Sequence, residues 1–157
     1  MGEEYNSDVV FRKARSQDAE ALAVASKRAF DSDVLYGAPG PGGPPGYDSA
    51  VWQRKMMRVG DYYAVVLDGR VIGGMIVFRK AAREYELCRI FVDPEFHNRG
   101  VGAKAFAFLW EQYALAKRWT LGTPAWNRRT RHFYQKMGFV DISEDAHEGI
   151  LFERVIV

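Results

Sequence analysis

The stretch "VDPEFHNRGVGAKAF" (residues 92–106) decides how this chain is built. An apolar run, "LCRIFV", leads into it and indicates a strand, whereas the residues after Gly102 favour a helix. Between them lie a proline, a polar turn and two glycines one residue apart, Gly100 and Gly102. Glycines at the start of a helix let a ligand approach backbone N–H groups that lack an intrahelical partner. The natural ligand for such groups is a phosphate.

Two common phosphate-binding motifs do not fit the glycine turn. The segment "GVGAKA" (100–105) matches the dinucleotide fingerprint, but seven residues, Asp93 to Arg99, separate the strand from the glycines. The region around "WTLGTPAWN" also lacks the acidic residue that would bind a ribose hydroxyl. A P-loop requires Lys and then Ser or Thr after its second glycine, and Ala103 follows Gly102 here. The sequence therefore argues against NAD and against a P-loop nucleotide.

Length and composition predict a single domain over residues 1–157. A net charge of +2 gives no electrostatic case for nucleic acid. The single cysteine, Cys88, excludes an internal disulfide and a cysteine-rich metal site, so we expect no metal. The start "MGEEYNSDVV" is unlike a signal peptide, and the apolar runs are too short to span a bilayer. We expect a cytoplasmic protein that binds no membrane.

The remaining sequence alternates between strand and helix patterns. Strands are predicted at 9–14, 84–92, 118–123, 139–143 and 149–157, with a hairpin at 61–80 around Asp68-Gly69. Helices are predicted at 16–30, 49–60, 100–117 and 127–137. Residues 31–48 hold five glycines and four prolines, which predicts no regular element there. The pattern is that of an α/β (α+β) domain.

Two blocks in this order resemble the GNAT superfamily of N-acetyltransferases. In "VDPEFHNRGVG" the turn resembles the family's acyl-CoA-binding segment, although His97 stands where a Gln or Arg is usual. In "NRRTRHFYQKMGFV" an Asn caps a helix, a Tyr follows seven positions later, and Gly138-Phe139 opens the next strand. The resemblance covers nearly the whole chain. It implies a mixed, mostly antiparallel sheet of about seven strands, about four helices, and central strands that splay apart at the CoA site.

The resemblance also implies which residues bind acetyl-CoA as cosubstrate. The pantetheine arm would pair with the open edge of the strand near Phe91 and Val92, in the manner of strand addition. The pyrophosphate would lie on the helix start, where the helix dipole favours an anion. Asn127 and Arg129 would contribute from the second block. The turn residues expected to bind are His97, Asn98, Arg99, Gly100, Val101, Gly102, Ala103 and Lys104.

Two residues are candidates for the acetyl-transfer chemistry. The resemblance assigns Tyr134 as the proton donor to the departing CoA sulfur. Glu86 matches the glutamate that some members use as general base; other members use a chain of water molecules, and both routes stay open. Period-2 alternation predicts that Glu86 shares a face with Cys88, Ile90 and Val92, where apolar neighbours would raise the pKa of its carboxyl.

The acceptor is expected to be a primary amine of a small molecule or peptide, acetylated by direct attack in a ternary complex. Acidic residues in the loop 31–48 and the connection 141–148 favour a cationic acceptor, unless these carboxylates are only solvated. From the first loop we expect Asp31, Asp33 and Tyr36 to bind it. The alternative is a non-catalytic acyl-CoA sensor on the same fold. A homodimer is compatible with the family.

Overall fold

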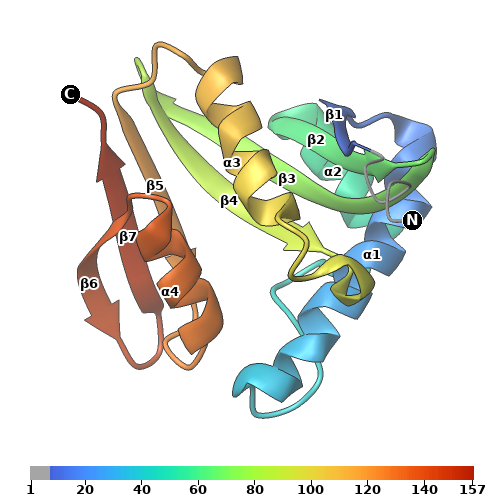
Figure 1. Cartoon of the computed structure of the whole chain (residues 1–157). Helices are drawn as coiled ribbons and strands as arrows, with labels where there is room; N and C mark the ends of the chain where they lie inside the picture. Colours follow the sequence, from blue (N-terminus) through green and yellow to red (C-terminus); the bar gives the residue numbers. More distant parts are fainter. Residues whose placement is uncertain (1–7) are drawn as a thin grey trace.

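A seven-stranded mixed sheet in the order β1-β2-β3-β4-β5-β7-β6 runs through the computed structural model, which describes residues 8–157 (Figure 1). All neighbouring strands are antiparallel except β4 and β5, which are parallel. The predicted fold class and element order are confirmed. The strands are β1 (Val10–Lys13), β2 (Asp61–Leu67), β3 (Arg70–Ala81), β4 (Glu84–Val92), β5 (Arg118–Thr123), β6 (Val140–Asp145) and β7 (Gly149–Val155).

Four helices cover the two faces of this sheet (Figure 1). Helix α3 packs Phe106 into a core cluster that also holds Trp119 of β5 and Tyr134 of α4. On the opposite face, α1 packs Leu22 into a second cluster around Ile76 of β3. The helices are α1 (Ala19–Asp31), α2 (Ala50–Val59), α3 (Val101–Gln112) and α4 (Arg128–Lys136).

Strands β4 and β5 pair over three rungs only and then separate. The parallel pairs join residues 84–86 of β4 to residues 118–120 of β5, and Glu86 with Thr120 is the last of them. Strand β3 stays paired with β4 as far as Val92. From residue 87 to residue 92, β4 therefore keeps one edge open. The predicted splay of the central strands is confirmed.

A β-bulge at Cys88 changes which residues of β4 share a face. Val77 of β3 pairs with Leu87 and Ile76 pairs with Arg89, so Cys88 is the extra residue. Consequently Ile90 packs in the α3-side cluster, whereas Cys88 packs in the cluster on the α1 side. The prediction that simple alternation puts Glu86, Cys88, Ile90 and Val92 on one face is wrong, because the bulge interrupts the period of two.

The loop between α1 and α2 contains one regular element that composition did not predict. A 3-10 helix, η3 (Ser32–Tyr36), continues from the end of α1. It ends at Gly37, whose φ of 110° is in the left-handed region that favours glycine. The glycines and prolines of this loop begin only at Gly37, so residues 32–36 contain no helix breaker. The composition averaged over residues 31–48 therefore did not predict this 3-10 helix.

Helix α3 ends at Gln112, short of the predicted end at Lys117. Tyr113 leaves the helical conformation, with φ −114° and ψ 54°. Its hydroxyl donates a hydrogen bond to Asp61 Oδ2 at 2.7 Å. The Tyr113 side chain therefore connects the end of α3 to the start of β2.

Two properties of residues 8–157 bear on the expected partners. None of their helices combines the length and the apolar content that a membrane crossing needs. Among the same residues, no group of three or more His, Cys, Asp or Glu side chains is arranged to bind a metal ion. Residues 1–7, on which the expectation of no signal peptide partly rests, lie outside the described residues.

Candidate active site

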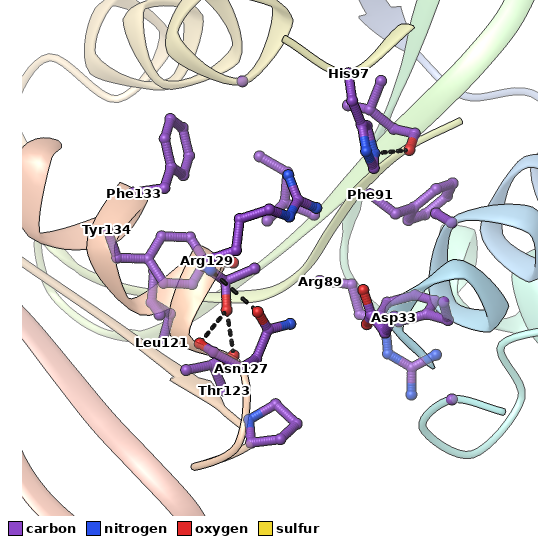
Figure 2. Close-up of a pocket in the computed structure, with 18 of the residues that line it drawn as sticks. Asp33, Arg89, Phe91, His97, Leu121, Thr123, Asn127, Arg129, Phe133 and Tyr134 are labelled. Atoms are coloured by element: carbon purple, nitrogen blue, oxygen red, sulfur yellow. Dashed lines mark hydrogen bonds between the residues drawn. The ribbon is translucent and has the colours of Figure 1, made fainter. Parts of the chain in front are cut away.

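A cavity of about 1060 Å³ opens where β4 and β5 separate (Figure 2). Strand β4 and the turn that follows it form one side, and α4 with the end of β5 forms the other. The end of α1 and the glycine-rich loop after η3 border it as well. The lining segments include residues 87–92, 96–98, 100–103, 121–124, 129–130, 132–134 and 38–44.

The turn after β4 presents backbone to this cavity. Asp93 caps the short 3-10 helix η4 (Pro94–Phe96), and its carboxylate accepts the N–H of Glu95 at 3.0 Å. Asn98 and Gly100 then take left-handed conformations, with φ of 64° and 76°, and α3 begins at Val101. The first N–H groups of α3 have no intrahelical acceptor and lie at the cavity wall. This arrangement suits a pyrophosphate.

The two glycines of the turn have different structural reasons. Gly100 supplies the left-handed conformation just before α3. At Gly102 an added Cβ would lie 2.8 Å from the Phe133 ring, so glycine here allows α3 to pack closely on α4. Gly102 thus sets the spacing of the two helices that border the cavity.

The basic residues of the turn differ in how they lie. Arg99 is exposed, and its guanidinium lies 5.4 Å from the centre of the Phe96 ring. Lys104 is exposed on the first turn of α3. Neither side chain lines the cavity, although both lie next to residues that do.

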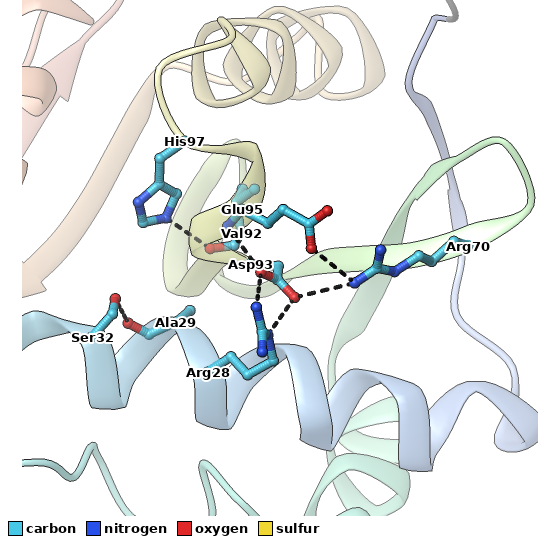
Figure 3. Close-up of polar contacts among 8 residues, drawn as sticks. All are labelled: Arg28, Ala29, Ser32, Arg70, Val92, Asp93, Glu95 and His97. Carbon is cyan, nitrogen blue, oxygen red and sulfur yellow. Dashed lines mark hydrogen bonds and ion pairs between the residues drawn. The ribbon is translucent and has the colours of Figure 1, made fainter.

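His97 binds the backbone of the strand that precedes it. Its Nε2 lies 2.8 Å from the carbonyl oxygen of Val92 (Figure 3). Burial lowers the pKa of His97, and Arg129 lowers it further. The ring is therefore held neutral, and its Nε2–H can donate to the Val92 carbonyl. In the resembling family a Gln or Arg is usual at this position, and both of these side chains are also hydrogen-bond donors.

Tyr134 faces the cavity from α4, opposite β4 (Figure 2). The residue is 7% exposed, and its ring packs edge-on against Phe106 and Phe152. Burial raises the pKa of its hydroxyl, which Arg129 opposes and Asp33 reinforces. The phenol therefore stays protonated at neutral pH and is available as a proton donor.

Asn127 and Arg129 stand at the start of α4, where β5 ends. The Asn127 side chain is buried and accepts the N–H of Thr130 at 3.1 Å, which is the predicted helix cap. Thr130 also bonds Thr123 of β5 at 3.0 Å between the two hydroxyls. The Arg129 guanidinium lies 4.5 Å from the centre of the Tyr36 ring. Through this contact η3 touches α4.

The predicted acidic residues do not all reach the cavity. The Glu86 carboxylate lies 3.8 Å from Lys80 Nζ, and Glu86 is not among the lining residues. Asp31 is bound by Lys27 at 2.6 Å and by the Tyr47 hydroxyl at 2.9 Å, also outside the lining. Asp33 lines the cavity directly.

In the acidic connection after α4 (residues 141–148), most carboxylates bind groups close by in the sequence instead of facing the main cavity. Asp141 pairs with Arg131 at 2.7 Å, and Asp145 accepts the N–H groups of His147 and Glu148. Residues 146–149 line a smaller cavity of about 300 Å³, which shares residues 122–124 with the main one. Of the acidic residues in this connection, only Glu148 lines this smaller cavity.

Arg89 is a cavity residue that the sequence reasoning missed. Its guanidinium lies 4.1 Å from the centre of the Trp52 ring, and Nη2 donates to the Pro45 carbonyl at 2.7 Å. Nη1 is buried and finds no partner in residues 8–157, and burial lowers the pKa of the side chain. A signal was present, because Arg89 interrupts the otherwise apolar run "LCRIFV".

The sequence is similar to parts of two curated proteins. The chain is 32% identical over 91 residues to the uncharacterised protein YrkN of Bacillus subtilis, an alignment that covers 55% of this chain and 49% of YrkN. It is 32% identical over 77 residues to an uncharacterised N-acetyltransferase of Mycobacterium bovis, covering 46% of this chain and 47% of that protein. The chain thus spans about half the length of the curated relatives it matches.

Solved structures share the fold over nearly the whole chain. The PaiA N-acetyltransferase of Thermoplasma acidophilum, crystallised with coenzyme A, matches with a TM-score of 0.80 and 16% identity, covering 95% of this chain and 99% of that one. The ribosomal-protein-S18-alanine N-acetyltransferase of Escherichia coli matches with a TM-score of 0.73 and 16% identity, covering 95% and 94%. The family model described as "Acetyltransferase (GNAT) family" matches residues 35–139. This chain belongs to the acetyltransferase (GNAT) family.

Proposed function

We propose that this protein transfers the acetyl group of acetyl-CoA to a primary amine by direct attack within a ternary complex. One observation carries the proposal. A single cavity joins the open edge of β4, the start of α3 and Tyr134, which are the three features this reaction needs. The named GNAT relatives support it, since one is described as an N-acetyltransferase and another was solved with coenzyme A.

The residues around the cavity suit the parts of acetyl-CoA. The N–H groups at Val101, Gly102 and Ala103 would bind the pyrophosphate. The open edge of β4 at Phe91 and Val92 would pair with the pantetheine arm. A backbone N–H of this edge would also stabilise the oxyanion that forms as the amine attacks.

Tyr134 would act on the leaving group. The amine nitrogen forms a bond to the thioester carbon, the carbon–sulfur bond breaks, and the Tyr134 hydroxyl gives its proton to the sulfur. The phenolate then regains a proton from the nitrogen of the new amide, so the reaction releases neutral CoA thiol. A buried phenol of raised pKa suits this role, because it is fully protonated before the sulfur leaves.

The first experiment is ligand protection followed by turnover. Acetyl-CoA should raise the melting temperature, whereas NAD and ATP should not. At a hundred times its dissociation constant, a bound ligand adds about 2.7 kcal/mol to the free energy of unfolding. A panel of amines would then be assayed for thiol release. Equal shifts with all three ligands would contradict the CoA site. Protection by acetyl-CoA without thiol release from any amine would favour the sensor alternative.

A further inference from the structure

The segment that carries Asp33 is held at the cavity wall at both of its ends. At its start, η3 continues directly from α1. At its end, Tyr36 packs against the Arg129 guanidinium of α4. Gly37 follows, and an added Cβ there would lie 3.1 Å from the Trp126 carbonyl oxygen, so the loop rests on the β5–α4 connection. The segment that carries Asp33 is thereby attached to the helix that carries Tyr134.

Asp33 is also the only carboxylate among the residues lining the cavity within 8–157. The other titratable side chains there are three cations, two imidazoles, a thiol and a phenol: Arg89, Arg129, Lys136, His97, His132, Cys88 and Tyr134. Of the two histidines, His97 is bound to the Val92 carbonyl and His132 is exposed. Among the described residues, Asp33 is therefore the one lining carboxylate that can accept a proton from an acceptor amine in this cavity.

The surroundings of Asp33 favour proton uptake. Burial raises the pKa of its carboxyl, and Arg129 acts against this. In the part of the chain that the structure describes, neither a hydrogen bond nor an ion pair neutralises the carboxylate. From α4, Arg129 and Tyr134 face it across the cavity, and Arg89 faces the cavity from β4 (Figure 2). Asp33 and Tyr134 thus flank the space where an acceptor would meet the thioester.

We infer that Asp33 is the general base of the acetyl transfer, a role that rests on the proposed function. The Asp33 carboxylate takes one proton from the acceptor's ammonium group, which leaves a neutral amine with a free electron pair. That pair attacks the thioester carbon, and Tyr134 protonates the departing sulfur as described above. The proton on Asp33 then passes to solvent as the products leave. Such a base is needed because an alkylamine with a pKa near about 10.4 is almost wholly protonated at neutral pH.

The pH dependence of kcat/KM distinguishes a base from a simple binding group. In the wild type, kcat/KM for an alkylamine should be level between the pKa of Asp33 and that of the amine. In Asp33→Asn only the free amine reacts, so kcat/KM should rise tenfold per pH unit up to the amine pKa. At neutral pH the loss should be about 10²–10⁴-fold, mostly in kcat. Asp33→Glu should restore the level region in part.

Two matched variants serve as controls. Asp31→Asn removes a neighbouring carboxylate outside the cavity, and Glu86→Gln removes the other candidate base. Both should keep the wild-type pH profile. A level profile in Asp33→Asn, with only KM raised, would overturn the inference and leave Asp33 as a binding group. Loss of the level region in Glu86→Gln instead would overturn it in favour of Glu86.

A measurement without turnover separates this inference from the proposed function. The Asp33 carboxyl can be titrated by ¹³C NMR, its resonance identified by its absence in Asp33→Asn. A pKa above the usual value of about 3.9 supports the base, and a pKa at or below it overturns the base even if acetyl transfer is observed. Conversely, failure of every amine in the thiol-release assay contradicts the proposed function whatever the titration gives.

Discussion

The imidazole of His97 and the backbone carbonyl of Val92 lie 2.8 Å apart, where β4 ends and the turn towards α3 begins (Figure 3). Val92 is the last residue of the open edge of β4, and Gly73 of β3 pairs with it from the other side. The histidine therefore fixes the carbonyl at the junction of the proposed pantetheine and pyrophosphate sites. The hydrogen bond from residue 97 thereby holds the turn against the end of β4.

Replacing His97 tests this bond. We expect His97→Gln to bind acetyl-CoA nearly as the wild type does, because the amide can still donate to the Val92 carbonyl. His97→Leu should bind about 2–12-fold more weakly, which corresponds to one hydrogen bond of 0.5–1.5 kcal/mol. Isothermal titration calorimetry measures both. Equal affinities in the Leu variant and the wild type would show that the bond has no part in binding.

The depressed pKa of His97 predicts a loss of stability on mild acidification. In the unfolded chain a histidine titrates near about 6.5, and burial holds the pKa of His97 below that value in the folded protein. Its contribution to stability is therefore complete above the unfolded value and is lost as the pH falls through the folded one. Urea unfolding at pH 7.5 and 5.5 should show a larger drop for the wild type than for His97→Gln. A larger drop in the variant would contradict the assignment.

Tyr134→Phe should separate chemistry from binding. The hydroxyl is proposed to protonate the sulfur, so turnover should fall by about 10²–10⁴-fold while acetyl-CoA affinity changes little. Tyr113→Phe is the matched control, since its hydroxyl bonds Asp61 instead of lining the cavity. That variant should keep wild-type turnover. Full turnover in Tyr134→Phe, with chemistry shown to limit the rate, would remove Tyr134 from the mechanism.

Gly73→Ala should displace the part of β4 that is proposed to bind the pantetheine arm, because Gly73 of β3 pairs with Val92 of β4. A Cβ at Gly73 would collide with the backbone carbonyl of Phe91, which cannot move unless β4 moves. We expect a loss of about 1–3 kcal/mol in unfolding free energy, together with weaker acetyl-CoA binding. Gly40→Ala is the control for stability, because an added Cβ there meets nothing within 4 Å. Similar unfolding midpoints for the two variants would mean that β4 tolerates the displacement.

The framework of the fold is predictable from the sequence because the signals for its elements are local. The hairpin between β2 and β3 follows from Asp68-Gly69, which take the left-handed conformations a tight turn requires. Asn127 caps α4 as its position before "RRTRHFYQKM" indicates. These features depend on neighbours in the chain, so a single sequence contains them.

The site was less predictable because its geometry depends on contacts between distant segments. The bulge at Cys88 arises from the pairing of β4 with β3, and no residue type in "ELCRIFV" marks it. That bulge decides which side chains of β4 share a face with Glu86. Asp33 lines the cavity and Asp31 does not. This difference depends on the contact between η3 and α4, which local composition does not reveal.

Asp93 and Arg28 give the last prediction, because their ion pair joins the end of β4 to α1. Arg28 donates to the Asp93 carboxylate through Nε at 2.8 Å and Nη2 at 3.1 Å, and Asp93 is only 3% exposed (Figure 3). Burial alone would raise the pKa of Asp93, but the bonds from Arg28 and the Glu95 N–H outweigh it and lower the pKa. The carboxylate thus contributes stability above its unfolded pKa of about 3.9, and this is lost as the pH falls through the folded value.

Asp93→Asn should therefore lower the unfolding free energy at pH 7 by about 1.5 kcal/mol. This is the low end for hydrogen bonds to a charged group, because half of the Arg28 side chain is exposed. Between pH 5 and 3 the wild type should lose stability more steeply than the variant, which urea unfolding at each pH would measure. Asp31→Asn is the control, because the Lys27 partner of Asp31 is exposed at the surface of α1 and a surface ion pair contributes little, and because the Tyr47 hydroxyl can still donate to an asparagine oxygen. If Asp93→Asn is as stable as Asp31→Asn and unfolds with the wild-type pH dependence, the junction between β4 and α1 does not depend on this carboxylate.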